Sequence, residues 1–401
     1  MILKSPPSKD FNNDGSVGTL GTMGTHGNHG ALSSQALPEA QEAKARHDAP
    51  ELRVLSDCPP LIGDTGKAAS AQPAPTVHLL MATYEGGDYL GEQLDSLAQQ
   101  SYARWTLTVS DDGSQDDTLQ IVGSFALKVT QAVRVIQGPR LGSTPNFVHL
   151  VNHVPWDDPE PSFSEFAALD TDLFGFVDQD DVWLPLKLSR AVAWHLHERD
   201  KDPRGLTAPL LYASAKQEVD AFLKPCHVPS ERLARVRPRL GFGGALTQNV
   251  VSGNTMVMNA ALIKIYQHIQ ANHAVWHDWT AYLVATGCGG LVHVDPEVSV
   301  LYRQHPRNVI GSQSGWGAQL RRLQQIPKGR YRGWLDANLA ATEDINSYLT
   351  PVSLSLRDHF KAIRSCGNPF RRIMLCRQSG LWRQSPLEQV AFMIGLGLGW
   401  V

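Results

Sequence analysis

Short apolar runs alternate with amphipathic segments through the middle of the chain. The runs at 77–82, 105–110, 133–136 and 173–177 have the length of strands and end at turn-prone residues, which predicts buried strands. Between the first two runs, Leu90, Leu94 and Leu97 recur at the spacing of a helix. Strands that alternate with helices at this spacing predict an α/β fold with a mostly parallel central sheet flanked by helices.

The same pattern predicts further elements along the chain. Asp88 is a candidate N-cap for the first helix, and Pro296 separates two apolar runs that predict two short strands. The further helices are expected at 118–125, at 145–154, from Leu186 to about His197, from Ala260, and from His277. The further short strands are expected at 210–213, 291–294 and 298–302.

The pattern weakens at both ends of the chain. Residues 1–75 are rich in Gly, Ser, Pro, Ala and Thr, so they predict a disordered tail that cannot bury enough apolar surface to fold. Residues 313–401 mix arginines with apolar residues and predict a helical C-terminal extension. Two interpretations of that extension stay open. Its helices either lie on an anionic membrane surface or form an ordinary helical cap whose basic side chains face water.

Composition excludes several classes of protein. The net charge of −3 over 401 residues does not indicate a nucleic-acid partner, and 42% hydrophobic residues are enough for a large core. Five scattered cysteines without a Cys-x-x-Cys spacing indicate neither a zinc site nor a disulfide framework. The chain has no run of about 20 apolar residues, so we expect no membrane span. We therefore expect a cytoplasmic protein, which would contact the inner membrane face peripherally if the membrane interpretation of its basic C-terminal region holds.

Three carboxylates stand together in the segment Asp178-Gln179-Asp180-Asp181-Val182-Trp183, directly after a predicted buried strand. Ligands of open α/β sheets bind at the carboxyl ends of strands, which is where this Asp-x-Asp segment lies. Like charges so close raise one another's pKa, and Mg²⁺ or Mn²⁺ would relieve the repulsion. The alternative is a solvated acidic loop or a helix cap.

Four segments occur in an order that resembles family 2 glycosyltransferases. They are Met81-Ala82-Thr83-Tyr84, Asp111-Asp112-Gly113-Ser114, the Asp178 to Trp183 segment and His277-Asp278-Trp279. Gln248-Asn249-Val250-Val251-Ser252-Gly253 and Tyr302-Arg303-Gln304-His305 look most like the rhamnosyltransferase-type branch, which assembles cell-surface polysaccharide. The resemblance covers about residues 76–312 and implies a glycosyltransferase domain with the GT-A fold.

The resemblance also implies roles for individual residues. The nucleotide-sugar donor would contact Ala82, Thr83, Tyr84, Glu85, Asp111, Asp112, Asn146, Asp178 and Arg303. Tyr84 would stack on the base, Asp112 would accept its N3–H, and Asp111 would either help or only hold the turn. Glu85 stands where the family usually has Asn, and we expect its carboxylate to point outward. The metal ligands would be Asp178, Asp180 and His305, with Asp181 behind them or capping a helix.

Asp278 occupies the position of the general base in the inverting members of the family. A carboxylate can take the proton of an acceptor hydroxyl within hydrogen-bond reach. The alternative is that Asp278 is only a helix N-cap. Trp183 and Trp279 would contact the acceptor sugar.

These residues together predict an inverting, metal-dependent transfer of a sugar from a nucleoside diphosphate sugar. The first guess for the donor is dTDP-rhamnose, and the expected acceptor is a cell-surface polysaccharide or a lipid-linked glycan. Two alternatives are a sugar nucleotidyltransferase and a non-catalytic glycan-binding protein on the same fold. The phosphate loop of a nucleotidyltransferase is poorly matched by Gly86-Gly87-Asp88.

Overall fold

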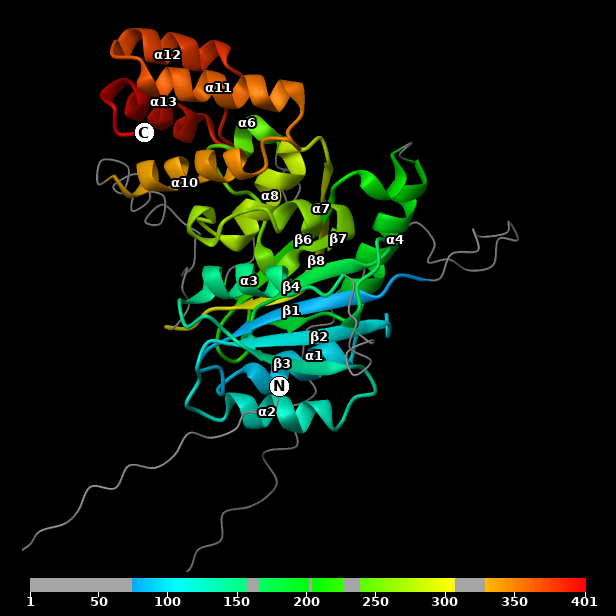
Figure 1. Ribbon diagram of the computed structural model, residues 1–401. Coiled ribbons are helices and arrows are strands. Elements are labelled where there is room, and N and C mark those ends of the chain that lie inside the picture. Colours follow the sequence, from blue (N-terminus) through cyan, green and yellow to red (C-terminus); the bar gives the residue numbers. More distant parts are fainter. Residues whose placement is uncertain (1–73, 157–165, 202–203, 227–238, 307–328) are drawn as a thin grey trace, which may run out of the picture. The chain divides into compact units, whose positions relative to one another are not determined.

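One mixed sheet organises the part of the chain that the computed structural model describes, namely residues 74–156, 166–201, 204–226, 239–306 and 329–401. Its eight strands follow the order β3-β2-β1-β4-β7-β6-β8-β5. The succession β3-β2-β1-β4 can be followed in Figure 1. The strands are β1 Val77–Thr83, β2 Trp105–Asp111, β3 Val133–Gln137, β4 Leu173–Val177, β5 Val182–Trp183, β6 Leu210–Val219, β7 Val257–Asn259 and β8 Leu291–Arg303.

Four of the strand pairs are parallel. The pairs β3–β2, β2–β1, β1–β4 and β6–β8 run parallel, whereas β4–β7, β7–β6 and β8–β5 run antiparallel. The carboxyl ends of β1, β2, β3 and β4 therefore meet at one edge of the sheet, where the turns that follow them lie close together. The predicted α/β fold with a central sheet flanked by helices is confirmed.

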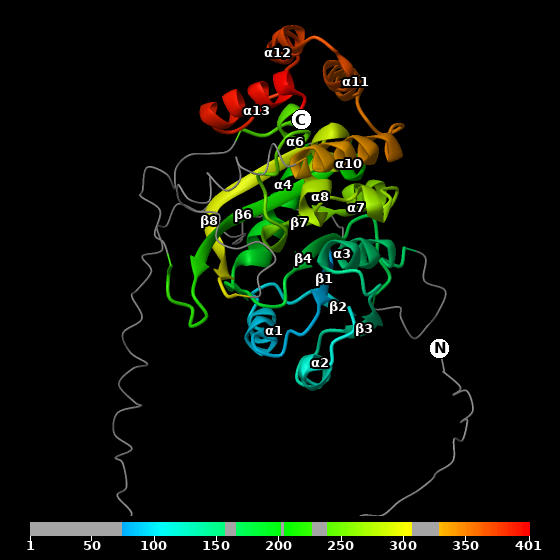
Figure 2. The same cartoon turned by 90° about the vertical axis from the view of Figure 1, so that its left-hand side faces the viewer.

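Helices cover both faces of the sheet, as Figure 2 shows from the side. Alternate residues of β1 explain this, because Val77, Leu79 and Met81 pack in a core with α1, α2 and α4, whereas Leu80 packs on the other face with α3, α7 and α8. The helices are α1 Leu90–Ala98, α2 Thr118–Ala126, α3 Ser143–Asn152, α4 Lys187–Lys201, α6 Phe242–Ala245, α7 Ala260–Tyr266, α8 His277–Gly287, α10 Arg330–Asp344, α11 Pro351–Ser365, α12 Pro369–Gln378 and α13 Pro386–Leu398. Three short 3₁₀ turns are η2 Gly205–Thr207, η3 Gly253–Thr255 and η4 Ala271–His273.

The four C-terminal helices share a core with the sheet. Leu335 of α10, Phe360 of α11 and Phe392 of α13 are buried in the same hydrophobic cluster as Phe174 and Phe176 of β4. All of these residues belong to one compact unit, Gln72–Val401. The boundary expected near residue 312 and the tail expected at 1–75 fall almost wholly outside the described residues, so both stay predictions.

Two local predictions differ from the structure. Pro296 does not separate two strands, because β8 runs through it with a bulge, where its register with β6 shifts near Ser214 and Ala215. A proline is tolerated at a bulge, since no ladder hydrogen bond needs its missing N–H. Asp88 does not cap α1 either, because the N-cap residue is Tyr89.

Candidate active site

The turns after β1 and β2 are tied together by two aspartates. Asp111 accepts hydrogen bonds from the Thr83 hydroxyl (3.0 Å) and from the Ser114 N–H (2.9 Å), and Thr83 is only 2% exposed. Asp112 accepts the backbone N–H groups of Arg140 (2.6 Å) and Gly142 (2.7 Å). Asp111 thus holds its own turn, which was one of its two predicted roles, and Asp112 also holds the loop after β3.

Tyr84 presents its ring to solvent beside the acidic turn after β4. The side chain is 59% exposed, and its backbone N–H and C=O bond the Gln179 side-chain amide at 2.9 and 3.0 Å. Glu85 has a left-handed backbone (φ 48°), and its carboxylate accepts the Gln115 N–H at 2.8 Å. Ala82 is half-buried at the end of β1. The exposed ring is therefore the group in this turn that is available for stacking on a base.

Asn146 does not face the site. It is 1% exposed, its side-chain oxygen accepts the Ser110 hydroxyl (2.5 Å), and its amide donates to the Ser110 carbonyl (2.8 Å). The prediction that Asn146 contacts the donor is wrong, because both ends of its amide are used to tie α3 to β2.

The three acids after β4 have different surroundings. Asp180 lies 2.9 Å from His305 through its Oδ2 and the imidazole Nε2. Asp181 is fully buried and accepts hydrogen bonds from the Asn254 amide and the Arg303 N–H. Asp178 is partly exposed. The structure therefore brings Asp180 and His305 together as predicted, and it gives Asp181 the inner position.

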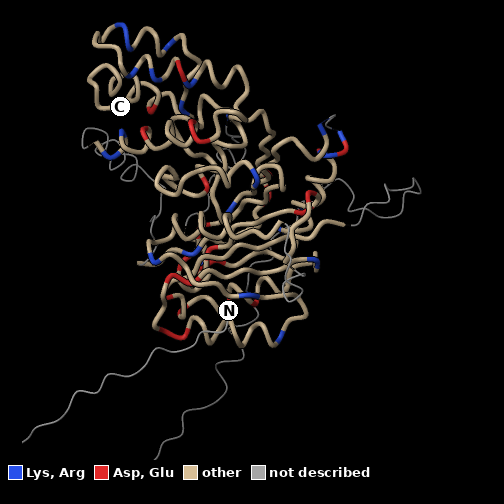
Figure 3. Tube along the Cα trace, in the orientation of Figure 1, with Lys and Arg blue, Asp and Glu red and all other residues tan. Residues whose placement is uncertain are grey.

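The acids also shift one another's pKa. Desolvation by the surrounding protein, followed by the charges of Asp181 and Asp180, raises the pKa of Asp178 well above its usual value, although part of the residue is exposed. Burial and the charge of Asp180 raise the pKa of Asp181 to about 7. Figure 3 shows acidic positions gathered in the turns at this edge of the sheet.

Arg303 holds the end of β8 in place and does not face the site. It is 1% exposed, donates to the Asp180 carbonyl (2.9 Å), pairs with Glu92, and lies 4.6 Å over the Tyr89 ring. A guanidinium enclosed in this way has no surface for a diphosphate, so the predicted contact between Arg303 and the donor is wrong.

Asp278 lies in the first turn of α8, after an N-cap residue that is Trp276. Its Oδ1 accepts the Trp279 N–H (2.7 Å) and its Oδ2 accepts the Gly253 N–H (3.3 Å). Burial raises the pKa of Asp278 to about 6. The alternative that Asp278 is only an N-cap is wrong, and the carboxylate is instead oriented by two backbone donors.

Comparison with known proteins shows which family part of the chain resembles. Residues 79–202, which include most of β1, all of β2 to β4, the acidic turns after them and all of α4, match the family model described as Glycosyl transferase family 2. This part of the chain is similar to family 2 glycosyltransferases, and the protein is a glycosyltransferase. The predicted glycosyltransferase is thus confirmed, and neither alternative function is supported by the match.

Curated relatives agree with this assignment. The dTDP-rhamnosyl transferase RfbG of Shigella flexneri is 24% identical over 263 residues, which are 63% of this chain and 81% of RfbG. The putative glycosyltransferase EpsE of Bacillus subtilis (strain 168) is 29% identical over 123 residues, which are 30% of this chain and 38% of EpsE. Among solved structures, the mannosyltransferase PcManGT of Pyrobaculum calidifontis, in complex with GDP-Man and Mn²⁺, aligns over 82% of this chain and 86% of its own at 15% identity. Its TM-score of 0.44 is too low to support conclusions about the site.

The glycosyltransferase also holds two lysines among its acids that the sequence pattern did not single out. Lys216 of β6 donates to the Ser252 hydroxyl (2.9 Å) and lies 3.7 Å over the Tyr302 ring. Burial lowers its pKa, while Asp181, Asp178 and Asp278 act in the opposite direction. The strand predicted at 210–213 ended before Lys216, so only the longer β6 places this cation in the site.

Lys187 is the second of these lysines. It is fully buried in α4, donates to the Thr255 carbonyl (3.1 Å) and lies 4.2 Å over the Trp183 ring. Burial lowers the pKa of Lys187 to about 7, and the charge of Asp181 opposes that shift. The inner carboxylate Asp181 therefore has a buried cation close enough to influence its charge.

Neither tryptophan that was predicted to contact the acceptor reaches the surface. Trp183 is 2% exposed in the core against α1 and α4, and Trp279 is 4% exposed with its indole N–H bonded to the Ala245 carbonyl (2.6 Å). Both predictions are wrong, because each indole is an anchor in the core rather than a platform at the site.

The residues present suit a divalent cation only in combination with a substrate. Among the described residues, no three His, Cys, Asp or Glu side chains are placed to hold a metal ion by themselves. Asp178, Asp180 and His305 nevertheless offer the carboxylate and imidazole ligands that Mn²⁺ accepts. The diphosphate of a donor would have to supply further oxygen ligands.

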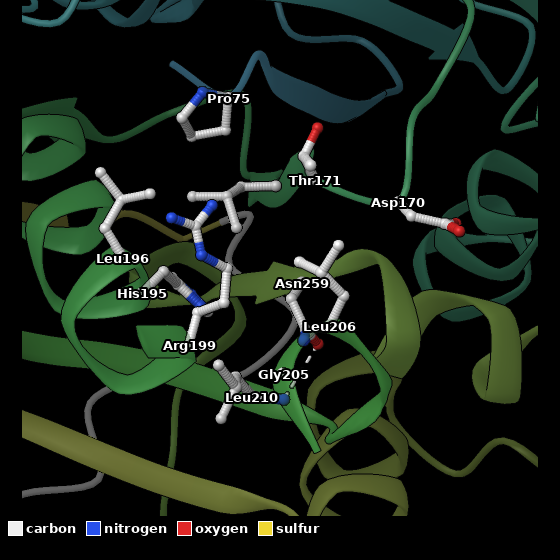
Figure 4. A pocket seen from close by; sticks show the side chains of 11 residues that line it. Pro75, Asp170, Thr171, His195, Leu196, Arg199, Gly205, Leu206, Leu210 and Asn259 are labelled. Atoms are coloured by element: carbon white, nitrogen blue, oxygen red, sulfur yellow. Dashed lines mark hydrogen bonds between the residues drawn. The ribbon is translucent and has the colours of Figure 1, made fainter. Parts of the chain in front are cut away.

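A small pocket lies at the opposite edge of the sheet (Figure 4). Its lining includes Leu173 and Leu210, the first residues of β4 and β6, together with His195, whose Nε2 bonds the Val257 carbonyl at 3.0 Å. Because it adjoins the beginnings of strands, this pocket is not part of the candidate active site.

Proposed function

We propose that this glycosyltransferase transfers a sugar, with rhamnose as the first candidate, from a nucleoside diphosphate sugar to a glycan acceptor with inversion of configuration. The observation that supports this most directly is the Asp278 carboxylate, held by two backbone N–H groups beside the acidic turn that follows β4. The dTDP-rhamnosyl activity named for RfbG supports rhamnose as the sugar and dTDP as its carrier.

Asp278 would act as the general base. Its pKa of about 6 leaves the carboxylate about nine-tenths ionised at pH 7, and it is still basic enough to take a proton as the hydroxyl attacks. The Gly253 and Trp279 N–H groups fix its orientation before the acceptor arrives. The acceptor oxygen then forms a bond to the anomeric carbon, the bond to the diphosphate breaks, and the proton moves to Asp278.

Asp178, Asp180 and His305 would hold a Mg²⁺ or Mn²⁺ ion together with the donor. A divalent ion held there would supply positive charge that offsets the negative charge of the departing diphosphate. The residues themselves provide a reason to bind it, because burial and, after it, repulsion among Asp178, Asp180 and Asp181 raise the pKa values of Asp178 and Asp181. Metal binding would relieve that repulsion.

Tyr84 and Asp112 would receive the nucleotide base. The Tyr84 ring is exposed at the end of β1 and is suited to stacking on a pyrimidine. Asp112 already accepts two backbone N–H groups. A carboxylate offers about four lone-pair sites, so Asp112 retains acceptor capacity for an N3–H.

We further propose that the acceptor is a growing polysaccharide or lipid-linked glycan at the inner face of the membrane. No helix within the described ranges is long and apolar enough to cross a bilayer. Contact with a lipid-linked acceptor would therefore have to be made from the membrane surface by this part of the chain.

The substitution Asp278→Asn tests the base. Asn keeps the shape and can accept one of the two backbone N–H groups through its oxygen, but it cannot take a proton. We expect sugar transfer to fall by about 100-fold or more, while donor binding, measured as thermal stabilisation by dTDP-rhamnose with Mn²⁺, stays within about twofold. Unchanged turnover would exclude Asp278 as the base.

A panel of sugar nucleotides tests the donor separately. Each is added with and without Mn²⁺, and the melting temperature reports binding to the folded state. Stabilisation by a dTDP-sugar above the UDP- and GDP-sugars is the expected result. Preference for another nucleotide would overturn the proposed donor without affecting the role of Asp278.

A further inference from the structure

One face of α13 is apolar and open to solvent along the whole helix. Leu387, Val390, Ile394 and Leu398 are 56%, 48%, 50% and 56% exposed. Their spacings of three, four and four residues place them in one row, because residues three and four apart lie on the same side of a helix. At 1.5 Å per residue this row, the α13 strip, extends about 16 Å.

The α13 strip is not the side by which the helix packs on the protein. Phe392, Gly395 and Leu396 are the buried residues of α13, and Phe392 and Leu396 lie in the main core. The helix therefore has two apolar sides, one packed in the core and one exposed to solvent. A contiguous exposed apolar row of this kind typically marks an interaction surface.

The neighbouring helix α12 continues the pattern with basic residues. Phe370 and Met374, one turn apart, are 83% and 52% exposed, and Arg371 and Arg377 are exposed beside them. We call these four residues the α12 face. The two helices pack on each other, and the Arg372 guanidinium donates to the Leu396 carbonyl at 3.2 Å (Figures 1 and 2).

Charge distinguishes between the partners that such a surface could take. Residues 366–401 contain four arginines and one acid, Glu388, and Glu388 lies 3.5 Å from Arg383 in an ion pair. A second copy of the chain would bring like charges together if it used the same surface. An anionic lipid bilayer would instead offer phosphates to the arginines and an apolar interior to the strip.

We propose that the α13 strip and the α12 face form a docking surface for an anionic lipid bilayer. The apolar side chains enter the boundary between headgroups and acyl chains, while Arg371 and Arg377 contact lipid phosphates. The contact is peripheral. It goes beyond the proposed sugar transfer, and it does not depend on the identity of the donor or on Asp278.

Vesicle flotation without any sugar nucleotide tests the surface directly. The full chain is mixed with vesicles of phosphatidylcholine alone or of phosphatidylcholine with phosphatidylglycerol. We expect binding to the anionic vesicles and at least about tenfold weaker binding to the neutral ones. The reason is that each arginine near an anionic lipid surface adds favourable binding free energy. Equal binding to both kinds, or to neither, would overturn the proposal.

Variants separate the two parts of the surface. Val390→Asp with Ile394→Asp should abolish binding, and Arg371→Gln with Arg377→Gln should weaken binding to anionic vesicles by about tenfold or more. The matched control is Leu127→Asp, because Leu127 is 90% exposed at the end of α2 and far from these helices in sequence. Control binding should equal that of the wild type.

Two further measurements keep the outcome clear. An unchanged melting temperature of each variant shows that it is folded. Light scattering after size-exclusion chromatography tests the rival occupant. If the wild type is a dimer, and Val390→Asp with Ile394→Asp makes it a monomer without changing vesicle binding, the surface is a contact between copies and the proposal is wrong.

Discussion

Gly253 can hold Asp278 because it has no side chain. Its N–H donates to the Asp278 Oδ2, and a Cβ on Gly253 would lie 2.3 Å from the Nε2 of His277. His277 cannot easily yield, since its buried ring stacks on Phe147 with centroids 3.8 Å apart. The orientation of Asp278 therefore depends on a glycine in a 3₁₀ turn that packs against His277, the residue before it.

The substitution Gly253→Ala should displace the backbone N–H of residue 253, which donates to Asp278. We expect kcat to fall by about 10- to 100-fold, because small displacements of a reacting group reduce the rate strongly. The control is Gly123→Ala, since nothing lies within 4 Å of the Cβ position in α2, and it should leave kcat unchanged. Steady-state kinetics give both values. If the clash is the cause, Gly253→Ala should cost less in a His277→Ala background, as a double-mutant cycle would show.

The C-terminal helices contact the rest of the compact unit closely at α6. Trp382, which lies between α12 and α13, packs against Gly243 and Gly244 of α6, where a Cβ on Gly244 would lie 2.4 Å from the indole. The Thr247 hydroxyl donates to the Trp382 carbonyl at 2.9 Å. Two adjacent glycines thus create the space that the indole fills.

The substitution Trp382→Ala should lower the free energy of unfolding by about 3–5 kcal/mol, because it leaves a cavity where a large ring was buried. The control is Phe370→Ala on the exposed side of α12, which should change that free energy by less than about 0.5 kcal/mol. Urea denaturation measures both. A value for Trp382→Ala as small as that of the control would show that the C-terminal helices are not stabilised by this contact.

The acidic site makes the stability of the whole molecule depend on pH and metal. The folded-state pKa values of Asp178, Asp181 and Asp278 are raised, to about 7 for Asp181 and about 6 for Asp278. Between about pH 4 and 7 the folded state thus binds more protons at these groups than the unfolded state. Their contribution to stability is present at low pH and is lost as pH rises through the folded-state values.

In the absence of metal, Asp178→Asn should therefore raise the melting temperature at pH 7.5 and change it less at pH 5. Mn²⁺ added together with a nucleoside diphosphate, at about 100 times the Kd of the pair, should stabilise the wild type by about 2.7 kcal/mol at pH 7.5, a shift of roughly 5 °C. Calorimetry at both pH values tests this, and Asp178→Asn should lose most of the Mn²⁺ shift. A wild-type shift that is equal at the two pH values, or kept by the variant, would contradict the predicted metal site.

The sequence by itself determined the alternation of strands and helices, the acidic turn after β4 and the position of Asp278. Periodic apolar residues report burial directly. Asp111, Asp112 and Asp178 stand at strand ends, and Asp278 stands in the first turn of α8. The structure agrees with the sequence on these features because each depends on neighbours within a few residues along the chain.

Only the tertiary structure decided which polar and aromatic side chains face the site. Trp183, Trp279, Asn146 and Arg303 look like binding residues in the sequence but are enclosed by partners up to about 200 residues away. Lys216 enters the site only because β6 continues alongside β8. Burial and pairing depend on contacts between segments that are distant in the sequence. The pattern of residues along the chain does not say which side chains another strand or helix will cover.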